Sequence, residues 1–126
     1  MNIPENYKYT KDHEWIRVEG NEAFIGITDF AQGELGDIVF VDIDKNISEI
    51  VKGKSFGTIE AVKTVSDLFA PCSGKVLEIN PNLESQPEII NQDPYVQGWI
   101  IKIELTNLDE LNDLMDNVAY QVQISA

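Results

Sequence analysis

The most informative stretch of this 126-residue sequence is Gly57-Thr58-Ile59-Glu60-Ala61-Val62-Lys63-Thr64-Val65-Ser66-Asp67. β-Branched and apolar residues lie on both sides of Lys63, which is typical of two short strands joined by a tight turn. We therefore predict a hairpin over about residues 55–70 with Lys63 near its tip. A lysine at such a tip is accessible and is a good acceptor for acylation. The alternative interpretation is a solvated turn lysine without a function.

Similar runs flank this hairpin and extend the β pattern along the chain. With the two hairpin runs, Ser55–Ala61 and Thr64–Phe69, they are Glu14–Val18, Ala23–Ile27, Ile38–Ile43, Lys75–Ile79 and Trp99–Leu105. Seven short strands at this spacing predict a mainly β fold, either a sandwich or a barrel.

Three segments have helical signals. Thr28 is suited to cap a short helix over residues 29–34, with Gly36 just beyond its end. A turn or two of helix is expected over residues 84–90, with Pro87 in the first turn. A C-terminal helix is predicted over about residues 107–116. It starts with a capping-box pattern and would pack an apolar face on the sheet; that face is Leu108, Leu111, Leu114 and Met115.

Composition excludes several classes of function. Nine Lys and Arg against 22 Asp and Glu leave a formal charge of −13, which disfavours nucleic acid and anionic membrane surfaces. No apolar run approaches the ~18 residues of a membrane span. The single cysteine, Cys72, cannot form an internal disulfide, which is typical of a protein from a reducing compartment. We therefore expect a cytoplasmic bacterial protein. The thiol of Cys72 is expected to be inert.

The sequence offers little for catalysis. One histidine and one cysteine cannot build a tetrahedral metal site, so no metal is predicted. His13-Glu14 begins a zinc-protease motif, but Arg17 stands where the second histidine is needed. No residue is therefore predicted to be catalytic.

Motifs along nearly the whole chain carry a family resemblance. They are Tyr9–Trp15, Gly26–Gln32, Leu35–Val41, Glu60-Ala61-Val62-Lys63, Ala70–Val76, Asn91–Tyr95 and Gly98-Trp99. In this order and spacing they resemble the H-protein family of the glycine cleavage system. The resemblance implies a single lipoyl-carrier domain over residues 1–126 with a barrel-sandwich hybrid fold, and lipoic acid covalently attached to Lys63. Biotin-carrying hairpins usually read Met-Lys-Met, whereas Val62 and Thr64 flank Lys63 here, which favours lipoate.

The resemblance also implies a carrier subunit rather than an enzyme. The lipoyl arm would take the aminomethyl group of glycine from the P protein, a pyridoxal-phosphate decarboxylase, to the T protein, an aminomethyltransferase. The L protein, a dihydrolipoamide dehydrogenase, would reoxidise the arm. A lipoate ligase or octanoyltransferase would load it, with Glu60 as a recognition residue. A lipoate relay to 2-oxoacid dehydrogenase complexes remains the alternative function, and an unmodified interaction module or an independent enzyme is a weaker one.

An acidic lining near the arm would hold the amine that the arm carries. Our candidates are Glu14 and Asp67, with Asp12 a weaker one; the alternative is that each is one of 22 solvated acids. His13 is interpreted as structural, with partner recognition as the minority hypothesis. The other expectations concern apolar residues: Trp15 and Trp99 in the core or half-buried, with docking as the minority hypothesis, and Phe30, Ala31 and Leu35 either in the core or along the groove for the arm.

Overall fold

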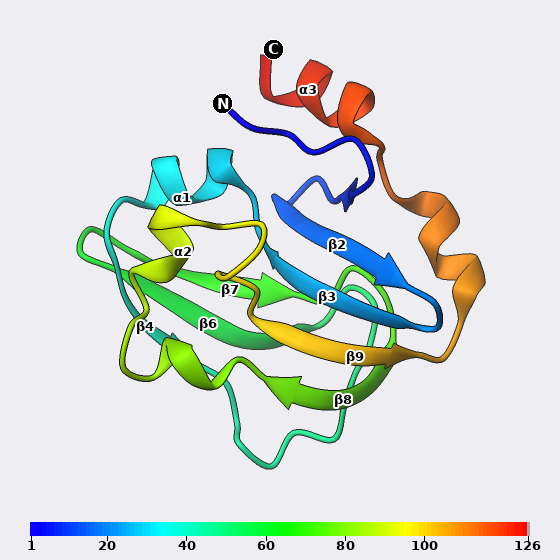
Figure 1. Cartoon of the computed structure of the whole chain (residues 1–126), viewed down its shortest axis with the longest axis horizontal. Helices are drawn as coiled ribbons and strands as arrows, with labels where there is room; N and C mark the ends of the chain where they lie inside the picture. Colours follow the sequence, from blue (N-terminus) through cyan, green and yellow to red (C-terminus); the bar gives the residue numbers. More distant parts are fainter. Residues whose placement is uncertain (126) are drawn as a thin grey trace.

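The computed structural model describes residues 1–125 and contains two β-sheets with short helices around them (Figure 1). The strands are β1 Lys8–Tyr9, β2 Glu14–Glu19, β3 Glu22–Ile27, β4 Ile38–Asp42, β5 Glu49–Ile50, β6 Ser55–Ala61, β7 Val65–Phe69, β8 Gly74–Ile79 and β9 Ile101–Leu105. The α-helices are α1 Asp29–Leu35, α2 Ile89–Gln92 and α3 Asn117–Ser125, and the 3-10 helices are η1 Pro81–Leu83 and η2 Leu108–Asp113.

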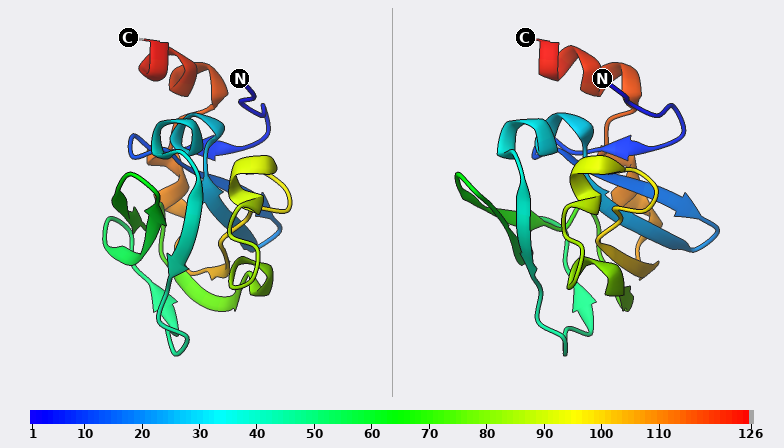
Figure 2. Two further views of the ribbon diagram at one scale, coloured as in Figure 1. Left: turned by 90° about the vertical axis from the view of Figure 1, so that its left-hand side faces the viewer. Right: turned by 60° about the vertical axis from the view of Figure 1, so that its left-hand side comes forward.

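The larger sheet has six strands in the order β1-β2-β3-β9-β8-β5, and the smaller has the order β4-β6-β7. Every pairing is antiparallel. All seven predicted strands are present, and the prediction of a mainly β fold is confirmed; the two-residue strands β1 and β5 are additional. Figures 1 and 2 show the turn between β6 and β7 projecting at the edge of the molecule.

Local sequence explains the pairing. In β9 the buried Ile101, Ile103 and Leu105 alternate with half-buried polar residues, so one face of the strand packs into the core. Strands β2 and β3 pair from Glu14 with Ile27 to Glu19 with Glu22, leaving a two-residue turn between them. The turn begins at a glycine with φ of +68°, a conformation that glycine adopts without steric cost.

The core lies between the sheets. Its main cluster joins Ile16 and Ile25 of the larger sheet to Ile59 and Leu68 of the smaller one. A second cluster is aromatic and consists of Tyr9, Trp15, Tyr95 and Tyr120. Trp15 is fully buried and Trp99 is half-buried beside this second cluster, and both agree with the expectation of core or half-buried tryptophans.

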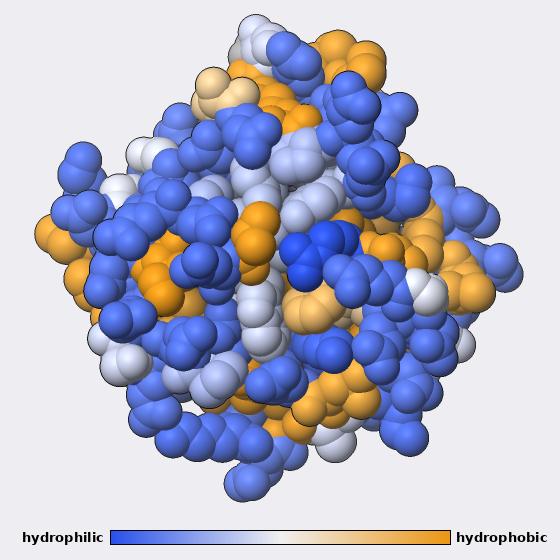
Figure 3. Space-filling view, in the orientation of Figure 1, coloured by the Kyte–Doolittle hydropathy of each residue, from blue (hydrophilic) through white to orange (hydrophobic). Residues whose placement is uncertain are grey.

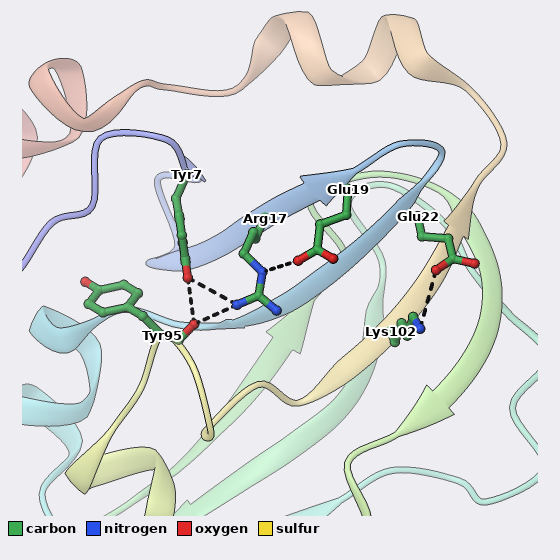
Figure 4. Close-up of polar contacts among 6 residues, drawn as sticks. All are labelled: Tyr7, Arg17, Glu19, Glu22, Tyr95 and Lys102. Carbon is green, nitrogen blue, oxygen red and sulfur yellow. Dashed lines mark hydrogen bonds and ion pairs between the residues drawn. The ribbon is translucent and has the colours of Figure 1, made fainter.

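A cluster around the single arginine holds the N-terminal segment against the larger sheet (Figure 4). The Arg17 guanidinium donates to the Tyr7 hydroxyl and to the Tyr95 carbonyl, both at 3.2 Å, and to Glu19 at 2.9 Å. It also lies 4.4 Å from the centre of the Phe24 ring. The only guanidinium is therefore bound within the fold, where it serves structure.

Helix α1 confirms the predicted caps. Thr28 accepts a hydrogen bond from the Ala31 amide at the start of the helix, and Gly36 ends it with φ of +82°. The helix expected over residues 84–90 is wrong in position: the chain forms η1 before this segment and the single-turn α2 at its end. The proline in the middle of the segment lacks an N–H and cannot continue a hydrogen-bond ladder, so the helix begins only after it.

The predicted C-terminal helix over residues 107–116 is also wrong. This segment is the shorter 3-10 helix η2, followed by Met115 in a β-bridge with Tyr9. Asn107 caps the Asp109 amide, but Glu110 does not complete the capping box. Its carboxylate instead accepts hydrogen bonds from Ser73, which ties η2 to the start of β8. The true C-terminal helix, α3, follows at residues 117–125.

Candidate functional site

Lys63 lies in the turn of the β6–β7 hairpin. The Ala61 amide donates to the Thr64 carbonyl at 2.8 Å, so Val62 and Lys63 form a two-residue turn. The Val62 amide donates to the Asp37 carbonyl at 3.1 Å and anchors the turn to the segment between α1 and β4. The Lys63 side chain is exposed, and no carboxylate of residues 1–125 lies within ion-pair distance of its amine. The amine is therefore free to be acylated.

The surface beside the turn mixes apolar and acidic side chains. Glu60 is exposed and pairs across the small sheet with Phe40 on one side and Val65 on the other. Both neighbours are themselves exposed, and Val62 in the turn is 72% exposed. Figure 3 shows small apolar areas of this kind within a mostly hydrophilic face. An enzyme that reaches Lys63 therefore meets Glu60 and these apolar side chains together.

A pocket of about 130 Å³ lies beside the hairpin, and we call it the acidic pocket. It is lined by the segment before β2, by the end of β3, by α1 and by the hairpin strands. Its apolar residues are Ile27, Ala31, Leu35, Ile59 and Leu68, and its polar residues are Asp12, His13, Glu14, Glu34, Ser66 and Asp67. The charged side chains among them are four carboxylates and, when protonated, one imidazole. The pocket thus combines an apolar wall with a strongly negative potential.

Glu14 is the buried carboxylate of this pocket. It is 3% exposed, and its two oxygens accept hydrogen bonds from the Thr10 hydroxyl at 2.7 Å and from the Phe69 amide at 3.3 Å. Burial raises the pKa of the Glu14 carboxyl to about 7, although both hydrogen bonds oppose this. Ionised Glu14 is therefore costly in the free protein, and a cation in the pocket would remove part of that cost.

The other predicted acids lie at the rim. Asp67 and Asp12 both line the pocket and are exposed, so the structure brings the three predicted carboxylates together. Glu34, on α1, was not predicted. The sequence signal that could have identified Glu34 is the Thr28 cap, which starts the predicted helix over residues 29–34. Glu34 lies in the last turn of this helix, and that turn faces the hairpin.

The three residues predicted for the groove lie in two different places. Ala31 and Leu35 line the acidic pocket, whereas Phe30 packs its ring 4.9 Å from the ring of His13. His13 is half-buried, has a backbone φ of +71°, and contacts the hydroxyl of Tyr120 through Nδ1 at 2.8 Å. Burial lowers the pKa of the His13 imidazole, against the opposing effect of Asp12 and Glu34. The Tyr120 contact was not predicted from the sequence.

Three hollows are larger than the acidic pocket, and one of them, of about 530 Å³, lies along the exposed side of α3. Another, of about 410 Å³, is formed by β4, η1 and nearby segments, and none of the predicted site residues lines it. The third, of about 350 Å³, shares Asp12 and Glu14 with the acidic pocket and extends toward η2. Size alone would favour the hollow on α3, but of these four hollows only the acidic pocket is lined by residues of the β6–β7 hairpin next to the turn. Cys72 is fully buried, and burial raises its thiol pKa to about 12, so it is unreactive.

The two-sheet fold that places Lys63 in the turn of a projecting hairpin is shared with a solved structure. The crystal structure of a glycine cleavage system H protein from Mycobacterium marinum superposes with a TM-score of 0.89 at 36% identity, covering 98% of this chain and 100% of that one. The sequence profile of the glycine cleavage H-protein family matches residues 7–126.

Two relatives named glycine cleavage system H protein agree. The protein from Symbiobacterium thermophilum is 57% identical over 119 residues, 94% of this chain and 93% of its own length. That from Bacteroides fragilis is 53% identical over 126 residues, all of both chains. The chain belongs to the glycine cleavage H-protein family. Among residues 1–125, no helix is long and apolar enough to cross a membrane.

Proposed function

We propose that this chain is the lipoyl carrier protein of the glycine cleavage system, with lipoic acid in amide linkage to Nζ of Lys63. The observation that carries the proposal is the environment of Lys63 in a member of this family. Its amine is exposed in a fixed two-residue turn next to the acidic pocket. The chain is then a non-catalytic subunit that supplies attachment, orientation and docking.

The lining of the acidic pocket fits the proposed group. Ile27, Leu35 and Ile59 offer an apolar wall to a hydrocarbon chain, and carboxylates surround its end. When attached, the lipoyl group supplies a disulfide that accepts the aminomethyl group of glycine at the P protein, delivers it at the T protein and is reoxidised by the L protein. Residues of the pocket would hold the loaded arm between these visits.

The carboxylates have separate tasks in this proposal. Glu14 accepts a charge-assisted hydrogen bond from the protonated amine, which lowers the cost of its own ionisation. Asp67 and Asp12, at the rim, add a negative potential that guides the amine inward. The apolar wall limits the access of water to the amine-bearing carbon and so slows hydrolytic loss.

The surface supports docking to several partners in turn. The proposed partners are the P, T and L proteins and a lipoate ligase or octanoyltransferase, the last acting at Glu60 and the turn. Acylation removes the Lys63 charge and takes the formal charge from −13 to −14, because eight Lys and Arg then remain against 22 acids. Such a surface favours basic docking sites, mainly through the association rate.

The decisive experiment is intact mass and peptide mapping after incubation with lipoate, ATP and a lipoate ligase. We expect one lipoyl adduct confined to Lys63. The Lys63→Arg variant keeps a positive charge but cannot form the amide, and serves as the matched control. A folded chain without an adduct, in the presence of an active ligase, would refute the proposal.

A further inference from the structure

His13 is held at the pocket by its backbone and by a chain of hydroxyl groups. Its amide donates to the Thr10 carbonyl at 3.1 Å, and its carbonyl accepts from the Thr28 amide at 3.0 Å. Its Nδ1 lies 2.8 Å from the Tyr120 hydroxyl, which lies 2.7 Å from the Thr28 hydroxyl oxygen. That oxygen also accepts from the Ala31 amide at 3.1 Å. A continuous path thus runs from the start of α1, through α3, to the ring that lines the acidic pocket.

The buried hydroxyl protons determine the direction of hydrogen-bond donation along this path. Thr28 and Tyr120 are both 0% exposed, so each hydroxyl proton needs a protein acceptor. Among residues 1–125 the Thr28 hydroxyl contacts the Ala31 amide, which only donates, and the Tyr120 oxygen. Thr28 must therefore donate to Tyr120. The Tyr120 proton then points to Nδ1 of His13, which must accept it and cannot carry a proton of its own.

The opposite direction leaves a buried proton without a partner. If Nδ1 of His13 were protonated, it would donate to Tyr120, and Tyr120 would donate to Thr28. The Thr28 oxygen would then accept twice, and its own proton would have no acceptor in a fully buried position. An unsatisfied buried donor carries its full desolvation cost, so this arrangement is disfavoured. The same argument disfavours imidazolium, which carries protons on both ring nitrogens.

We propose that Thr28 and Tyr120 hold His13 as the uncharged Nε2–H tautomer and thereby keep a competing cation out of the acidic pocket. Thr28 and Tyr120 are then positioning residues that act through His13, and α3 belongs functionally to a pocket that none of its residues lines. The functional part rests on the proposed function above, in which the pocket receives a protonated amine.

The surroundings show why such a device is needed. The charged groups that face the pocket with His13 are Asp12 beside it, Glu14 at the start of β2, Glu34 on α1 and Asp67 on β7. Of these, Asp12 and Glu34 favour a protonated imidazole, which would then occupy the acceptors that the amine requires. Burial and the hydroxyl path oppose them and keep the acceptors available.

The first test measures the tautomer directly. The chain contains one histidine, so in the ¹⁵N-labelled protein, without a histidine tag, every imidazole signal belongs to His13. Long-range ¹H–¹⁵N correlation near neutral pH should show an unprotonated Nδ1 and a protonated Nε2. A protonated Nδ1, or the averaged signals of a freely exchanging imidazole, would overturn the proposal. This measurement requires neither lipoate nor any partner.

The second test removes the hydroxyl. Tyr120→Phe keeps the ring stacked 4.8 Å from that of Tyr9 but deletes the donor to Nδ1, so the His13 titration should move to higher pH. Tyr9→Phe is the matched control, because Tyr9 is equally buried and its hydroxyl donates to the Pro4 carbonyl instead. An unchanged titration in Tyr120→Phe, or the same shift in both variants, would contradict the proposal. If Tyr120→Phe does not fold, the tautomer of the unmodified chain still decides.

A third measurement links the hydroxyl path to the lipoyl arm. In the lipoylated chain loaded with the aminomethyl group, the rate of its loss should increase as pH falls through the His13 titration in Tyr120→Phe, but not in the Tyr9→Phe control. Equal rates in both variants would refute the functional part. Failure of the carrier proposal would appear separately, as the absence of a lipoyl adduct in the mass spectrum.

Discussion

Replacing Glu14 by glutamine measures the free-energy cost of ionising this carboxyl in the acidic pocket. The pKa of this carboxyl is raised by burial from 4.5 to about 7, so the folded state binds more protons than the unfolded state between these values. The Glu14 contribution to stability is therefore present at low pH and is lost as pH rises through about 7. The corresponding free energy is about 3 kcal/mol, because water screens a carboxyl that is only 3% exposed very little.

Glutamine removes this pH dependence at nearly constant shape. Its oxygen can still accept from the Phe69 amide, while its NH₂ group faces Thr10, at a cost of about 1 kcal/mol for the altered hydrogen bond. We expect Glu14→Gln to gain about 2 to 3 kcal/mol relative to the unmodified chain between about pH 5 and about pH 8. Groups that titrate alike in both proteins cancel in this difference.

Urea unfolding at several pH values provides the assay, since each free energy comes from a linear extrapolation. Glu78→Gln is the matched control: it makes the same charge change at an exposed site on β8, and its stability should follow that of the unmodified chain. Parallel curves for Glu14→Gln and the unmodified chain across this pH range would refute the reasoning, because they would mean that Glu14 ionises at no cost.

The remaining predictions concern the arm, the core and docking. Lys63→Arg should change the free energy of unfolding by less than about 0.5 kcal/mol, since the side chain is exposed, but should abolish the lipoyl mass increase; an adduct on this variant would contradict the assignment. Gly26→Ala should destabilise by about 1 to 3 kcal/mol in urea unfolding, because a Cβ there would lie 2.7 Å from the buried Trp15 ring. Gly33→Ala, on α1 with open space around it, is the control and should be neutral or slightly stabilising. Raising ionic strength should slow aminomethyl transfer from the P protein, and a rate that is flat with salt would argue against electrostatic docking.

The sequence predicted the β-structure well because the local signals agree with the tertiary ones. Alternation in segments such as Ile101–Leu105 and the Thr28 and Gly36 caps describe elements that also pack well in the fold. Helix α3 was missed because Val118, Tyr120 and Val122 stand at every second position, a period of two that does not suggest a helix. The missed signal was Asp116, whose side chain accepts from the amide three residues later and caps that helix.

The site was predicted only as far as the motifs extend. Lys63 and its turn follow from the hairpin pattern, and the family resemblance indicated Glu14 and Asp67. The contact between His13 and Tyr120 spans 107 positions and depends on how α3 docks, which no local pattern specifies. The depth at which Glu14 lies is likewise a property of the assembled sheets. Long-range packing thus decides the electrostatics of the acidic pocket, even though local sequence supplies its members.

The tight turn at Lys63 also limits how far its side chain can reach from the protein. The bonds from Ala61 to Thr64 and from Val62 to Asp37 anchor the backbone, so the Lys63 Cα does not swing with a loose loop. A lipoyl group on Lys63, as proposed, would then move on a sphere whose radius is the length of one modified side chain. Each enzyme that used this arm would have to bring its reacting atoms within that radius. On the proposed function, the length of one side chain therefore limits how deep a partner's active-site channel can be.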